Sequence, residues 1–179
     1  MRPAYWRFSP FVSPARLVIL LSLLCAALCM PSRSEAKENC PWLNEATAGG
    51  TLEGTVTSTV THPNSNKDDA TCEFIHRDGA IATELEIEVA TIGGAHDAFA
   101  AYVARCGQNS VPLKAIGNEA VACSVDDRTK KRSVSEQVVG RVRDRAFTVR
   151  ITSNAASPER GALREAARKI AEQVAGFLF

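Results

Sequence analysis

The sequence predicts an α+β domain in which helices pack against a mostly antiparallel sheet of about six strands. Three observations indicate this class. Residues 55–61 are dense in β-branched side chains, and over residues 81–89 a face of Ile, Thr, Leu, Ile and Val alternates with a face of Ala and three Glu. Two later stretches, 95–106 and 157–178, place apolar side chains at helical spacing. The expected element order is α-β-β-β-α-β-β-β-α.

An uncharged apolar run, residues 17–30, lies near the start of the chain. It follows three arginines and precedes the small-residue site Ser34-Glu35-Ala36, as in a secretory signal peptide. We expect cleavage after Ala36. The alternative is a retained membrane anchor, but a helix of 14 residues rises only about 21 Å, whereas the hydrocarbon core is roughly 30 Å thick.

A lipid anchor on Cys25 or Cys29 is a further alternative, because both cysteines lie at the end of the apolar run. A lipoprotein signal has a small residue before the modified cysteine, whereas leucine stands there in both cases. We therefore expect residues 1–36 to be a cleavable signal peptide. Residues 37–179 should then form one secreted or periplasmic domain that contains no transmembrane helix.

Composition narrows the range of partners. The chain has 21 Lys and Arg residues and 20 Asp and Glu residues. Removing residues 1–36 takes away four arginines and one glutamate, which leaves a net charge near −2 over 143 residues. That length suits one domain, and the charge gives no reason to expect nucleic acid as a partner. We expect a monomer that uses no cofactor.

A short helix is expected at the start of the mature domain. Pro41, within Asn39-Cys40-Pro41-Trp42-Leu43, suits the first helical position. The helix should fade near Gly49-Gly50. Packing by Trp42 and Leu43 must hold it in place, since an isolated helix of this length is unstable in water.

Three strands follow this helix. The first is the β-branched stretch, and a polar loop separates it from a second strand on which Cys72 and Phe74 face inward. The apolar face of the third, most regular strand comprises Ile81, Thr83, Leu85, Ile87 and Val89. Its other face carries Glu84, Glu86 and Glu88, which should be solvated because stacked carboxylates are costly to desolvate. This open face is our candidate contact surface for a partner.

The second half of the domain begins with a helix over 95–106 that ends at Gly107, followed by a strand over 119–125. A hairpin comes next, with Asp144-Arg145 as its two-residue turn. The expected register pairs Arg143 with Ala146, Val142 with Phe147, Gly140 with Val149 and Val138 with Ile151. The apolar faces of the two strands coincide in that register, and a one-residue slip would separate them.

The last helix is the best defined element. Ser157 is expected as its N-cap, Pro158 as its first residue and Glu159 near the positive end of its dipole. Its apolar stripe comprises Leu163, Ala166, Ala167, Ile170, Val174, Phe177 and Leu178. Glu165 and Lys169 should pair on the polar side. The helix should lie across the sheet and complete the core.

Four cysteines belong to the mature domain: Cys40, Cys72, Cys106 and Cys123. An even number in an exported chain indicates two disulfides, although three pairings exist. We favour Cys40–Cys72 and Cys106–Cys123, because each pair joins a helix to a neighbouring strand. The alternative, four free buried thiols, requires that export fails. No two cysteines have the CxxC spacing of a zinc knuckle or of a thioredoxin-type site.

Signals for catalytic and metal sites are weak. His62, His76 and His96 show no ligand spacing for zinc, and the polar loop 64–69 lacks the glycine and glutamate of a calcium loop. No GxSxG motif supplies an activated nucleophile. The basic loop 128–132 could hold a polyanion or a glycan, but two neighbouring aspartates favour ordinary solvation. We predict no catalytic, cofactor-binding or metal-binding residue.

Three short motifs carry a resemblance to a known family. Cys40-Pro41-Trp42-Leu43, Cys72-Glu73-Phe74 and Gly117-Asn118-Glu119-Ala120 resemble segments of a large family of exported bacterial proteins of unknown function. The actinobacterial members of that family are mostly lipoproteins. The resemblance implies a PsbP-like α/β sandwich and no established activity, and it supplies no active-site residues. The chain departs from the lipoprotein members because it lacks a small residue before Cys25 or Cys29.

These observations predict a non-enzymatic binding or accessory domain of the bacterial cell envelope. Its partner would be an unidentified envelope or extracellular ligand. A small periplasmic hydrolase and a structural subunit of an envelope complex are the alternatives. A groove with convergent polar groups between sheet and helices would favour the enzyme, whereas a smooth exposed apolar patch would favour the accessory role.

Overall fold

The computed structural model describes residues 38–63, 66, 68–93, 96–125 and 133–179. The expected signal peptide and the basic loop lie outside these ranges, as does part of the polar loop 64–69. The described elements in chain order are α2 (Glu45–Thr51), β1 (Val56–Thr61), β2 (Ala70–Asp78), β3 (Ile81–Thr91), α3 (His96–Ala104), the 3₁₀ turn η1 (Gly107–Asn109), β4 (Val111–Leu113), β5 (Glu119–Val125), β6 (Val134–Val142), β7 (Arg145–Ser153) and α4 (Arg160–Leu178).

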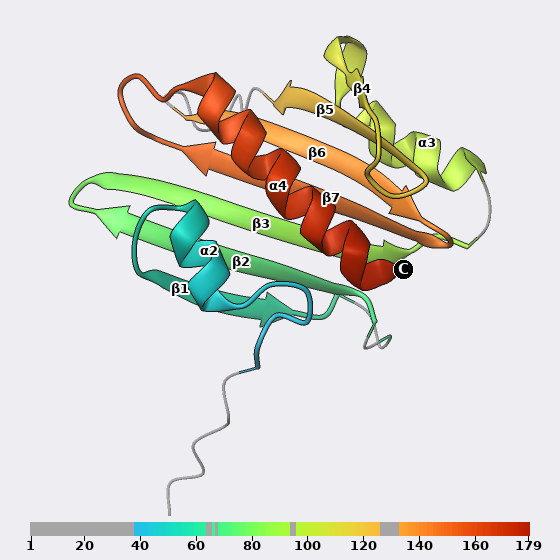
Figure 1. The fold of residues 1–179 in the computed structure, drawn as a ribbon, viewed down its shortest axis with the longest axis horizontal. Helices are drawn as coiled ribbons and strands as arrows, with labels where there is room; N and C mark the ends of the chain where they lie inside the picture. Colours follow the sequence, from blue (N-terminus) through green and yellow to red (C-terminus); the bar gives the residue numbers. More distant parts are fainter. Residues whose placement is uncertain (1–37, 64–65, 67, 94–95, 126–132) are drawn as a thin grey trace, which may run out of the picture. The chain divides into compact units, whose positions relative to one another are not determined.

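The strands of the described chain form one antiparallel sheet in the order β1-β2-β3-β7-β6-β5-β4. α2 and α4 cover one face, here called the inner face, while α3 packs on the outer face over β5 and β6 (Figure 1). The α+β class and the mostly antiparallel sheet therefore agree with the sequence prediction. None of the helices in the described ranges has the length and apolar character that a bilayer crossing needs.

The sheet has seven strands where the sequence predicted about six. The additional strand is β4, a three-residue segment that contains Pro112 and pairs with β5 at the edge of the sheet. Proline is tolerated at an edge because it has no N–H to contribute to a ladder. A segment this short shows no alternation that a sequence pattern could reveal.

The main core lies between the inner face of the sheet and the two helices α2 and α4. Its largest fully buried apolar side chains are Phe74, Leu85, Ile87, Val89, Val138, Val142, Phe147, Ile151 and Ile170. The alternating face of β3 and the stripe of α4 thus meet as expected. Phe177 is the exception, because its side chain is 67% exposed at the end of α4.

The hairpin of β6 and β7 has the expected faces but a different register. Its turn is Arg143-Asp144, and Gly140 pairs with Phe147 rather than with Val149. The observed register differs from the expected one by two residues, which leaves every side chain on its predicted face. Its physical reason is the Phe147 ring, which occupies the space above Gly140 where any other residue would have its Cβ.

Two helices begin later than the sequence predicted. α2 starts at Glu45 because the Asn44 side chain caps it, accepting a 2.8 Å hydrogen bond from the Thr47 N–H. Pro41 therefore lies before the helix. α4 starts at Arg160, and its first helical bond runs from the Leu163 N–H to the Glu159 carbonyl. The residue expected as its cap, Ser157, stays in the preceding loop.

Two disulfides join the pairs that the sequence favoured. Cys40, just before α2, bonds to Cys72 in β2, and Cys106, just after α3, bonds to Cys123 in β5. The Cα–Cα distances are 5.7 and 5.5 Å, both usual for disulfides. One bridge therefore fixes the chain that leads into α2 on the inner side. The other fixes the end of α3 on the outer side.

Candidate functional site

A groove of about 610 Å³ lies between α2 and α4 and is here called the α2–α4 groove. In Figure 1 the two helices lie over different strands of the inner face, and β3 runs between them. The lining residues come from the end of α2, from β3 and β7, and from the loop and first turns of α4. They are Gly50, Thr51, Leu52, Glu53, Thr83, Ile151, Ser153, Ala155, Pro158, Glu159, Ala162, Leu163, Glu165, Ala166 and Lys169.

The base of the groove includes apolar side chains from β7 and α4. Ile151 is fully buried on β7, and Leu163 and Ala166 face it from one side of α4. Ser153 follows two residues later on the same strand face, and its hydroxyl oxygen accepts a 3.3 Å bond from the Ala155 N–H. The groove therefore offers an apolar contact surface at its base, with its serine already bonded.

The rim of the groove is charged. Glu53 projects from the α2 side, while Glu159, Glu165 and Lys169 belong to the α4 side. Arg168 donates bonds of 2.9 and 2.7 Å to the two carboxylate oxygens of Glu165. These hydrogen bonds hold the pKa of the Glu165 carboxyl below its usual value, so it is ionised at neutral pH.

Glu53 has an unusual backbone conformation at the mouth of the groove. Its φ is 60°, in the left-handed region where a side chain other than that of glycine costs about 1 kcal/mol. The position follows the C-cap of α2, and the Gly54 N–H bonds back to the Gly49 carbonyl at 2.9 Å, as in a Schellman motif. Glycine would suit this position better, yet the chain places a carboxylate there.

The α2 side of the groove is anchored to β1 and β2. Ser58 donates a 2.5 Å hydrogen bond to the Glu45 carboxylate in the first turn of α2. Ala48, also in α2, is fully buried. The Cys40–Cys72 disulfide holds the preceding segment. A helix of seven residues is too short to be stable alone, so these contacts determine where Glu53 lies.

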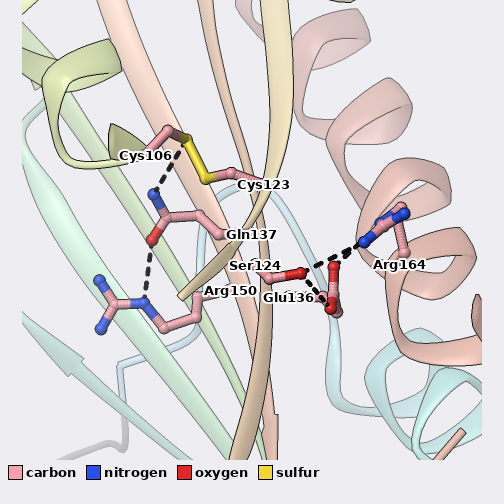
Figure 2. The surroundings of a disulfide bond; sticks show 7 residues. All are labelled: Cys106, Cys123, Ser124, Glu136, Gln137, Arg150 and Arg164. Atoms are coloured by element: carbon pink, nitrogen blue, oxygen red, sulfur yellow. Dashed lines mark hydrogen bonds and ion pairs between the residues drawn. A yellow bond between two sulfur atoms is a disulfide. The ribbon is translucent and has the colours of Figure 1, made fainter. Parts of the chain in front are cut away.

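The α4 side of the groove is anchored to the sheet by a buried carboxylate of β6, which binds arginines of α4. Glu136 of β6 is fully buried and accepts bonds from Ser124 at 2.7 Å and from Arg164 at 2.9 Å (Figure 2). Arg160 reaches the same carboxylate at 3.3 Å. A buried charge is tolerated only when it is paired and hydrogen-bonded, and two guanidinium groups satisfy this requirement. The network ties the first turns of α4 to the sheet.

The predicted contact surface lies on the outer face, away from the groove. Glu84, Glu86 and Glu88 share that face, as expected, but each is only half-exposed rather than fully solvated. Arg105, just after α3, bonds Glu88 at 2.9 Å, and Arg150 of β7 lies 3.8 Å from Glu86. Cations from neighbouring elements thus partly cover the carboxylates. Their role as a contact surface stays a prediction.

Burial raises the pKa of Glu86, and the neighbouring glutamates reinforce the rise while Arg150 opposes it. A polar row continues from Glu86 across the sheet: Arg150 donates a 3.1 Å bond to Gln137, whose amide lies 3.9 Å from the Cys106 sulfur (Figure 2). Gln137 is 1% exposed. This row contributes to the packing of the outer face and reaches the second disulfide.

In the described part of the chain, His62 and His76 make separate contacts, while the side chain of His96 lies outside what the structure describes. The His62 ring contacts the Asp69 carbonyl and the Glu38 carboxylate, and the His76 ring contacts the Thr55 carbonyl. Within the described ranges, no three His, Cys, Asp or Glu side chains come together in a way that could hold a metal ion. The lining of the groove consists of aliphatic, hydroxyl, carboxylate and ammonium groups, which suit binding by apolar and ionic contact.

The groove could not be recognised from the sequence. Leu163 and Ala166 were expected on the apolar stripe of the last helix, where they would belong to the core. They lie at the edge of that stripe and are only half-buried, because α2 ends before it covers them. The one local signal was Glu53 beside Gly54, a glutamate at the end of a short helix.

No protein-family model and no curated protein matches this sequence.

Proposed function

We propose that this chain is an exported binding domain whose ligand occupies the α2–α4 groove. The proposal includes cleavage of the signal peptide after Ala36, a secreted or periplasmic location, and membership of the exported bacterial family with the PsbP-like fold. The two disulfides support the location, because such bonds persist in oxidising compartments.

The observation that carries the proposal is the groove itself. Ligand pockets commonly have volumes of about 300–1,000 Å³, an apolar lining and a few placed polar groups. The α2–α4 groove, at about 610 Å³, combines an apolar floor at Ile151 and Leu163 with a charged rim.

Binding is favoured over hydrolysis by the chemistry of the lining. A nucleophile needs an adjacent base, and the lining of the groove contains neither histidine nor cysteine. Its buried serine, Ser153, has a backbone N–H as its hydrogen-bond partner rather than a base. The carboxylates Glu53, Glu159 and Glu165 also line the groove, which suits recognition of a ligand.

The test uses 4-phenylbutanol, an uncharged probe with an apolar body. The full chain is expressed, the exported protein is purified, and methyl NMR spectra are recorded during a titration. We expect saturable shifts for the methyl groups of Ile151, Leu163 and Ala166, with no change for Val121 and Val125 on the outer face. Nuclear Overhauser contacts between the probe and Leu163 should confirm the site.

A blocked variant provides the matched control. Ala162 is exposed and lines the groove, so Ala162→Trp should fill the hollow without disturbing the core and should abolish the shifts. Ala101→Trp, an equally exposed alanine on α3, should leave the titration unchanged. Equal shifts in both variants, or no saturable shift in the parent protein, would overturn the proposal.

A further inference from the structure

We infer that the ligand of the α2–α4 groove is an organic cation, an amine joined to an apolar body. The inference rests on the proposed binding function and adds the chemical class of the ligand. Its basis is the asymmetry between an apolar floor and a rim on which carboxylates outnumber cations. An amine of this kind would place its apolar part on Leu163 and Ala166, above the buried Ile151, and its ammonium group among the rim carboxylates.

The rim has an excess of negative charge. Glu53, Glu159 and Glu165 line the groove, and Lys169 is the one cationic side chain among its lining residues. Among these lining side chains, three carboxylates stand against one ammonium group, a net charge of −2 before Arg168 is considered. The carboxylates come from both walls, so a cation between them would interact with both. A ligand carrying a carboxylate or phosphate would meet repulsion from both.

The arginines of α4 do not reverse this charge. Arg160 and Arg164 both reach Glu136 of β6, and Figure 2 shows this contact for Arg164. Arg168 binds Glu165 but also contacts Glu172, so one guanidinium is shared between two carboxylates. Glu159 is the N-cap residue of α4, so its carboxylate adds negative charge near the positive end of the helix dipole, although its side chain makes no capping hydrogen bond.

The backbone at Glu53 supports a functional role for its carboxylate. Residues held in sparsely populated conformations cluster at ligand-binding sites, and Glu53 has a left-handed backbone that glycine would adopt more easily. Its side chain is exposed at the mouth of the groove, where packing gives it no evident purpose. Recognition of a positive charge would explain why a carboxylate stands at this position.

Three probes with the same apolar body separate the charge of the ligand from its shape: 4-phenylbutylamine, 4-phenylbutanol and 4-phenylbutyrate. Their dissociation constants are measured on the exported protein from the methyl shifts of Ile151 and Leu163. We expect the amine to bind about ten-fold more tightly than the alcohol, which is the scale of a charge-assisted hydrogen bond, and the butyrate to bind more weakly than the alcohol. Raising the salt concentration should weaken the amine alone.

Variants locate the charge effect. The double variant Glu53→Gln with Glu165→Gln should reduce the preference for the amine over the alcohol to less than about two-fold, with alcohol binding unchanged. Glu84→Gln, on the outer face, should change neither affinity. Should the alcohol and the butyrate bind as tightly as the amine, only the inference about charge falls. Should none of the three probes bind, the proposed binding function falls together with it.

Discussion

Replacing Gly140 by alanine should destabilise the fold strongly, because the Phe147 ring occupies the space that the new methyl group would need. An alanine Cβ at this position would lie 2.2 Å from Cζ of Phe147, 2.7 Å from Cε1 and 2.9 Å from Cε2. Carbon atoms in contact prefer separations of about 3.5–4.0 Å. Three ring atoms would therefore overlap with one methyl group.

The ring cannot move aside at low cost. Phe147 is fully buried in the main core, and its strand is paired on both sides, by β3 and by β6. Overpacking a core usually costs about 1–3 kcal/mol, and three simultaneous overlaps place this substitution near about 3 kcal/mol. For a domain of this length, such a loss lowers the melting temperature by about 6–12 °C.

Urea unfolding followed by fluorescence measures the effect, since Trp42 is buried and should report the loss of the core. Gly176→Ala is the control, because nothing lies within 4 Å of a Cβ built at this exposed position of α4. That substitution should stabilise the helix by about 0.5–1 kcal/mol. A methyl group should therefore destabilise the protein at Gly140 and stabilise it at Gly176.

A double-mutant cycle tests the cause. Phe147→Leu should lower stability by itself but should relieve the clash, so the combined variant with Gly140→Ala should be more stable than the sum of the single effects allows. Additive effects would show that the ring and the glycine do not interact in the way described. Wild-type stability for Gly140→Ala alone would refute the register of the β6–β7 hairpin.

Three further predictions concern stability, ligand binding and pH. Glu53→Gly should raise the free energy of unfolding by up to about 1 kcal/mol and weaken 4-phenylbutylamine binding, and a loss of stability would contradict the left-handed backbone at this position. Replacing Cys40 and Cys72 together by alanine should remove about 3–4 kcal/mol in urea unfolding, as expected for bridged residues 32 positions apart, and an unchanged midpoint would argue against this bridge. Burial raises the pKa of Glu86 in the folded state above its value in the unfolded chain. Protonation of Glu86 therefore favours the folded state, and this contribution to stability is complete below the unfolded pKa and is lost as the pH rises through the folded pKa. The stability of the Glu86→Gln variant relative to wild type should therefore increase as the pH is raised from 4 to 7. A constant difference across that range would contradict the raised pKa.

Local patterns in the sequence predicted much of the fold. The alternation over 81–89 identified β3 and both of its faces, and the helical stripe after Pro158 identified α4. The register of the hairpin was missed by two residues, because alternation repeats every two residues and leaves such a shift invisible. The correct register could have been chosen only by noticing that Gly140, which has no Cβ, provides room for the Phe147 ring.

The candidate site was harder to predict, because it depends on the distance between elements that are far apart in sequence. Glu53 and Glu165 line one groove, although Glu53 follows the first helix of the domain and Glu165 belongs to the last. Neither residue type nor spacing indicates that α2 ends short of α4. The three glutamates of β3, in contrast, share a face by simple alternation and were found for that reason.

The central claim is that the chain is exported, loses its first 36 residues and is held together by the two disulfides. Intact mass spectrometry of protein recovered from expressing cells tests this claim most directly, before and after reduction and alkylation. We expect a chain that begins at Lys37, carries no lipid and takes up alkylating reagent at four cysteines only after reduction. Full-length protein from the cytosol whose thiols react without reduction would contradict it.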